Sequence, residues 1–81
     1  MTTGKIKFNE PNDVKNFVNL VSKYDMDVDV KHGTTMLDGK SIQGLMAIQL
    51  QVELMCVLHD DISNCTDIIR DIQLYIVEDF K

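Results

Sequence analysis

The sequence predicts an α+β fold: an open-faced βαββαβα sandwich with a four-stranded antiparallel sheet and three helices on one face. Short segments that alternate polar and apolar residues indicate strands with one buried face. Other segments carry apolar residues at helical spacing, which indicates helices packed on a sheet. The chain has 81 residues, 44% of them hydrophobic, with no internal repeat or linker. We therefore expect one domain over residues 1–81.

The first part of the chain predicts a strand followed by a helix. Residues 5–8 read Lys-Ile-Lys-Phe, an alternation that indicates a short strand. A helix start is indicated at Glu10-Pro11, because proline and acidic residues are favoured in a first helical turn. The inner face of this helix is expected to consist of Val14, Phe17, Val18 and Val21.

A hairpin is predicted next. Residues 25–30 alternate Asp-Met-Asp-Val-Asp-Val, which is the clearest strand pattern in the chain. His32-Gly33 indicates a turn into a second strand over residues 34–37. The solvent face of the first strand, or an edge protected from pairing, is expected to carry Asp25, Asp27 and Asp29.

A short helix is expected to begin at Ser41, because a serine before an apolar run accepts hydrogen bonds from the free N–H groups of a first turn. Residues 52–58 then predict an apolar strand, and residues 61–65 a polar junction. The inner stripe of a last helix is predicted to be Cys65, Ile68, Ile69, Ile72, Tyr75 and Ile76.

Composition argues against several function classes. The net charge is −5 and no basic stripe is present, so we expect no binding to nucleic acid or to an anionic membrane. Neither a secretory signal after Met1 nor an apolar run of bilayer length is found. Cys56 and Cys65 are too few for a disulfide framework, and we expect them to be buried thiols in a reducing cytoplasm.

Two segments resemble the HPr family, the histidine-containing phosphocarriers of the bacterial sugar phosphotransferase system. One is Lys40-Ser41-Ile42-Gln43-Gly44-Leu45-Met46, which is similar to the family's K-S-I-x-G-[VLI]-M helix. The other, residues 22–28, looks like the entry to the family's second strand. Together with the element order, the resemblance covers essentially the whole chain. It implies the HPr-like fold and a place in the regulation of carbohydrate uptake.

The family's phosphocarrier histidine has no counterpart in this chain. It lies within G-[LI]-H-[AT]-R-P, whereas residues 8–14 here contain neither histidine nor arginine. Glu10 and Asp13 place negative charge where a phosphohistidine needs positive charge. The resemblance therefore implies a degenerate member without histidine phosphotransfer. An active phosphocarrier that uses a non-standard residue is the alternative.

The family's regulatory serine is present as Ser41. In Gram-positive relatives a serine kinase phosphorylates this position, and the modified protein docks on a transcription regulator. The resemblance implies the same kinds of partner here, with Ile42, Gln43 and Met46 as the docking patch. Gln43 departs from the bulky apolar residue that the family usually carries. Leu45 and Ile48 are expected in the core, and Ile42 and Met46 half-exposed.

Neither histidine indicates catalysis. His32 is expected in a solvated turn, and His59 in a solvated loop before Asp60-Asp61. One imidazole and two acids without a further placed ligand are a weak metal site, although a metal-binding or small-ligand module on this scaffold stays an alternative. A Cys56–His59 nucleophilic pair lacks an orienting third group. We expect no enzyme activity, no cofactor and no metal.

Overall fold

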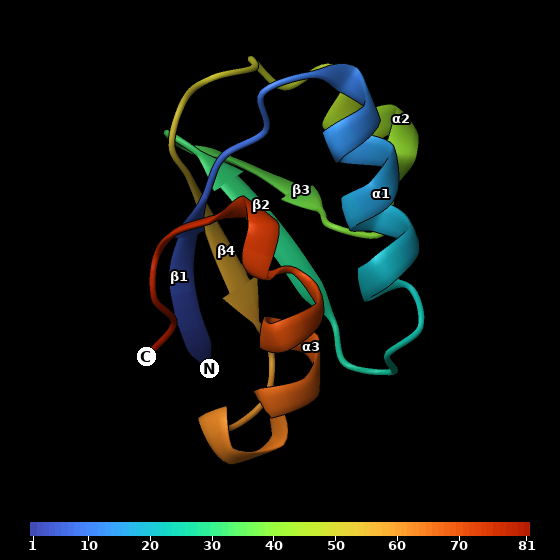
Figure 1. Ribbon diagram of the computed structural model, residues 1–81. Coiled ribbons are helices and arrows are strands. Elements are labelled where there is room, and N and C mark those ends of the chain that lie inside the picture. The colour runs from blue at the N-terminus through green and yellow to red at the C-terminus, as the bar shows by residue number, and fades with distance from the viewer.

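The computed structural model describes residues 1–81 and confirms an α+β fold with three α-helices and an antiparallel sheet. The sheet has five strands rather than the four predicted, in the order β3-β2-β4-β1-β5. The helices pack on one face of the sheet and leave the other face open (Figure 1). The strands are β1 Thr2–Ile6, β2 Val28–His32, β3 Thr35–Asp38, β4 Leu54–Leu58 and β5 Ile76–Glu78. The helices are α1 Pro11–Val21, α2 Ile42–Met46 and α3 Thr66–Asp71, with single 3-10 turns at Ile62–Asn64 and Gln73–Tyr75.

Helix α1 begins where the sequence predicts it. Glu10 is its N-cap and Pro11 its first residue. The Asp13 carboxylate accepts the backbone N–H groups of Asn9 (2.9 Å) and Glu10 (3.3 Å), as in a capping box. The predicted inner face is confirmed as buried: Val14, Phe17, Val18 and Val21.

The first hairpin is displaced from its predicted position. Strand β2 begins at Val28, so Asp25 and Asp27 lie outside it. Asp29 does lie in β2, but β2 is flanked by β3 and β4, so the interpretation as an edge strand is wrong. His32 ends β2, and the turn that follows consists of Gly33 and the residue after it.

The C-terminal segment corrects the prediction of one long helix. Helix α3 ends at Asp71, a 3-10 turn follows, and Ile76 begins β5 instead of continuing the helical stripe. Ile76 pairs with Ile6, which accounts for the fifth strand. Lys81 and Thr3 then exchange two backbone hydrogen bonds of 2.9 and 3.0 Å. Pairing with the otherwise open edge of β1 satisfies backbone groups that a longer helix would leave free.

The core joins the inner face of the sheet to all three helices. Phe8, Phe17 and Tyr75 form an aromatic cluster with ring centroids 5.2 to 6.1 Å apart, in tilted or edge-to-face arrangements. Cys56 and Cys65 are confirmed as buried free thiols. No helix combines the length and apolar character that crossing a bilayer requires.

A Gly4→Ala substitution is expected to lower the free energy of unfolding by about 1–3 kcal/mol, since overpacking a filled core forces its neighbours to move. An added Cβ would lie 2.8 Å from two ring carbons of Phe80 and 3.0 Å from the carbonyl oxygen of Glu78. Urea unfolding measures the loss. A Phe80→Ala background removes both of these ring carbons, so Gly4→Ala should cost less there. An equal cost in both backgrounds would contradict this account.

Stability is expected to fall as the pH rises from about 9 to about 12. Burial, with the nearby charges of Asp29 and Cys65, raises the pKa of the Cys56 thiol from 9.0 to about 12. In this range the unfolded chain loses the thiol proton first, so deprotonation favours unfolding. Urea midpoints measured across the range should show a shallower decline in Cys56→Ala. The tyrosine residues also titrate at high pH, but they are present in both proteins, so they do not account for a difference between them. An unchanged slope in Cys56→Ala would show that Cys56 is not responsible for the decline.

Candidate functional site

The segment between β3 and α2 turns the chain through a close contact with β2. The Gly39 N–H donates to the Val28 carbonyl oxygen at 2.7 Å. A Cβ on residue 39 would lie 2.7 Å from the Val28 Cγ1 atom and 2.9 Å from that carbonyl oxygen, so glycine is needed here. The Asp38 carboxylate accepts the Lys40 N–H at 2.9 Å, and the Asp38 carbonyl accepts the Ser41 N–H at 3.1 Å. These bonds place Ser41 at the start of α2.

The prediction that Ser41 caps this helix is confirmed. Its backbone is extended, with φ −104° and ψ 108°, and its Oγ accepts the Gly44 N–H at 3.3 Å. Its carbonyl oxygen accepts the Leu45 N–H at 3.1 Å. The side chain is half-buried, and no acidic residue lies in the first turn of α2. One N–H group of the first turn, that of Gly44, is therefore satisfied by a neutral hydroxyl.

The three residues that the resemblance implies as a docking patch lie on or near the outer side of α2. Ile42 is 41% exposed and Met46 is 43% exposed. They lie four residues apart and hence on the same side of the helix, and Gln43 beside them is also exposed. Leu45 and Ile48 are buried, as the sequence predicts. Ile42, Gln43 and Met46 are called the α2 patch below.

Lys40, the residue before Ser41, is bound to the loop that follows α1. Its ammonium donates to the Tyr24 carbonyl oxygen, just after α1. The Tyr24 hydroxyl in turn donates to the Asp71 carboxylate at the end of α3. This hydrogen bond raises the pKa of Tyr24, with burial as a further cause. The entrance to α2 is thus tied to α1 and α3 through a short chain of polar contacts.

Neither histidine lies in α1 or in the residues directly before it. His59 is exposed after β4, and its Nε2 atom lies 2.7 Å from the Asp29 Oδ2 atom on β2. The sequence did not predict this contact, because it joins residues 30 positions apart. The one available signal was the alternation around Asp29, which placed its side chain on the solvent side of the strand. The Cys56 side chain is fully buried, so the Cys56–His59 interpretation fails.

Asp60 and Asp61, the two acidic residues that follow His59, form a local turn. The Asp60 carboxylate accepts the Asp61 N–H at 2.8 Å and the Asn64 amide at 2.9 Å, and these bonds lower its pKa. Nowhere does the chain bring together three or more histidine, cysteine or acidic side chains that could hold a metal ion.

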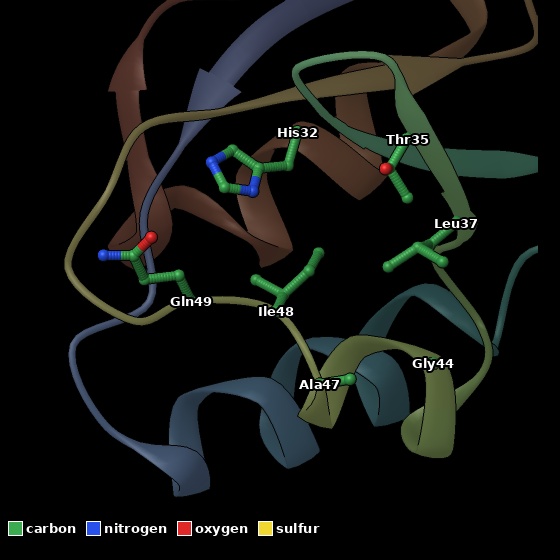
Figure 2. Close-up of a pocket in the computed structure, with 7 residues that line it drawn as sticks. All are labelled: His32, Thr35, Leu37, Gly44, Ala47, Ile48 and Gln49. Atoms are coloured by element: carbon green, nitrogen blue, oxygen red, sulfur yellow. The ribbon is translucent and has the colours of Figure 1, made fainter.

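A pocket of about 450 Å³ lies between the β2–β3 hairpin and the end of α2. The Leu37 and Ile48 side chains point toward one another across it, and His32 lies at its hairpin side (Figure 2). Sequence reasoning missed this pocket, because it combines residues 32–37 with residues 44–49. Local patterns do not show which side of α2 meets the hairpin. Its lining residues are His32, Thr35, Leu37, Gly44, Ala47, Ile48 and Gln49.

No protein-family model matches this chain, and no curated protein matches its sequence. Among solved structures, the chain is similar to Crh, a catabolite repression protein of Bacillus subtilis. The TM-score is 0.62 at 16% sequence identity, over 85% of this chain and 84% of Crh. This similarity supports the predicted HPr-like fold.

Proposed function

We propose that this chain is a non-enzymatic HPr-like protein of the sugar phosphotransferase system, which acts through protein contacts and is regulated by phosphorylation at Ser41. The observation that carries the proposal is the geometry of α2. Ser41 caps the helix, and Ile42 and Met46 are exposed on its outer side. A charge added at Ser41 would therefore border the apolar surface that meets a partner. The fold shared with Crh is consistent with this proposal.

The start of α2 can accommodate a phosphate. The peptide dipoles at a helix start favour negative charge, and no acidic residue lies in the first turn of α2. Lys40 is the residue before Ser41, and its ammonium donates a hydrogen bond to a neutral carbonyl oxygen. The ammonium can give up this bond and donate to a phosphate oxygen on Ser41 instead. The Asp38 carboxylate opposes the added charge, but it is already bonded to the Lys40 N–H.

Phosphotransfer through histidine is not part of the proposal. At the start of α1, the Asp13 carboxylate occupies the N–H groups of Asn9 and Glu10. A phosphoryl group there would meet negative charge instead of an arginine. His59 is engaged with Asp29, and His32 lies beside the pocket. We therefore propose a regulatory role in the cytoplasm, with a serine kinase and a transcription regulator as the kinds of partner.

Intact-mass measurement after two separate incubations tests the proposal. With phosphoenolpyruvate and the first enzyme of the phosphotransferase system, we expect no gain in mass, because no histidine lies at the start of α1. With the serine kinase and ATP, we expect the mass of one phosphate to be added. Ser41→Ala should abolish that gain, whereas Ser63→Ala, a change at another exposed serine, should not.

Two results would overturn the proposal. A gain in mass after incubation with phosphoenolpyruvate and the first enzyme would favour the alternative, an active phosphocarrier. No phosphate from the kinase, or phosphate that persists in Ser41→Ala, would remove the switch at Ser41.

The cap itself has a measurable stability effect. Ser41→Ala is expected to lower the free energy of unfolding by about 1 kcal/mol, because the Gly44 N–H loses its acceptor. Ser41→Asp should keep most of the stability, since aspartate also caps helices and adds charge where the dipole favours it. Thermal unfolding monitored by circular dichroism measures both. If Ser41→Asp were less stable than Ser41→Ala, the start of α2 would not tolerate negative charge.

A further inference from the structure

The β3 strand presents a free backbone edge. It is the terminal strand of the sheet and pairs only with β2. The Gly39 N–H bonds the Val28 carbonyl oxygen, which sets the alternation of hydrogen-bonded positions along β3. Residues 35, 37 and 39 therefore face β2, and the N–H groups of Met36 and Asp38 point away from the sheet. The Asp38 carbonyl turns to Ser41, but the Met36 carbonyl stays available at the edge.

This edge lacks two common protections against pairing, a lysine and a proline. Three of its four residues are exposed, Met36 by 54%. A strand added here would form hydrogen bonds with both backbone groups of Met36 and with the Asp38 N–H. Strand addition of this kind gives affinity through the backbone and specificity through pockets for alternate side chains.

The pocket lies beside this edge, on the helix side of the sheet. Leu37 and Thr35, whose side chains point to that side, form part of its wall (Figure 2). Ala47 and Ile48, which directly follow α2, close it on the opposite side. In an added strand, the side chain opposite Leu37 would point to the same side and enter the pocket. The apolar walls fit an aliphatic side chain there.

The charges on the open face of the sheet indicate which kind of residue the added strand should carry opposite Asp38. Asp38 pairs across the strands with Asp29, so both carboxylates lie on the open face. His59 is bound to Asp29, whereas the Asp38 carboxylate accepts only the Lys40 N–H and forms no ion pair. A basic residue opposite Asp38 would supply the missing positive charge.

We propose that the β3 edge binds an extended peptide segment of another protein as an added antiparallel strand, with a basic residue opposite Asp38 and an aliphatic residue in the pocket. From its N-terminus, the segment has a basic residue opposite Asp38, an aliphatic residue opposite Leu37, and then any two residues opposite Met36 and Thr35. This surface is distinct from the α2 patch, and the proposal does not depend on phosphorylation of Ser41.

Nuclear magnetic resonance titration of the full chain tests the proposal. The probe is the peptide acetyl-Gly-Ser-Arg-Leu-Thr-Leu-Ser-Gly-amide, added to about 2 mM so that a Kd near 1 mM is measurable. We expect the largest amide shifts at Met36, Asp38, Ala47 and Ile48. Methylation of the threonine backbone nitrogen removes the donor to the Met36 carbonyl, and should weaken binding at least about tenfold. Replacement of the arginine by glutamate should also weaken it.

Two variants at one position separate backbone pairing from side-chain contact. Met36→Pro removes the outward N–H, which no bond within the sheet uses, so the fold is expected to persist. Met36→Ala keeps that N–H and serves as the matched control. We expect Met36→Pro to abolish binding and Met36→Ala to retain it, with circular dichroism showing that both are folded.

Every other outcome counts against the proposal. If no shifts appear at β3, or if binding survives both Met36→Pro and methylation, strand addition is wrong. If binding is insensitive to the arginine-to-glutamate change, the role of Asp38 is wrong. Sedimentation of the chain alone tests a second copy as the occupant, and a dimer lost in Met36→Pro would overturn the choice of a peptide partner.

Discussion

The close contact between Gly39 and Val28 determines how the end of the molecule around α2 is built. Because residue 39 has no side chain, its N–H reaches the Val28 carbonyl oxygen at 2.7 Å, and β3 stays paired to its last residue. The chain must then turn at once, and the bond from the Ser41 N–H to the Asp38 carbonyl closes that turn at 3.1 Å. One backbone contact therefore places the cap of α2 and also fixes which backbone groups of β3 face outward.

The helix starts differ in the charge that they can accept. Asp13 lies in the first turn of α1, where its carboxylate completes the capping box, and Asp67 lies in the first turn of α3. At both starts a carboxylate already offsets the helix dipole. Helix α2 is capped by the Ser41 hydroxyl and has no acidic residue in its first turn. Added negative charge should therefore be better tolerated at α2 than at α1, the helix start at which HPr proteins carry their phosphocarrier histidine.

Sequence patterns predicted the elements whose signals are local. The α1 stripe and the Ser41 cap depend on neighbours within a few residues, and both were confirmed. The end of α3 was mispredicted because Tyr75 and Ile76 fit a helical stripe as well as they fit a 3-10 turn and a strand. Their assignment depends on pairing with β1, some 70 residues away in the chain. The pocket and the His59–Asp29 contact were missed for the same reason, since each joins distant segments.

Helix α2 contributes to both of the surfaces proposed here. Ile42 and Met46 lie on its outer side, whereas Gly44 and the C-cap residue Ala47 line the pocket beside β3. The Gly44 N–H is the group that Ser41 binds, so the cap touches the wall of the pocket directly. Coupling free energies between two sites are reciprocal. If phosphate at Ser41 moves Gly44 and thereby changes the affinity for a peptide at β3, the bound peptide changes the free energy of phosphorylation by the same amount. With only five residues, α2 has few internal hydrogen bonds to resist such a movement.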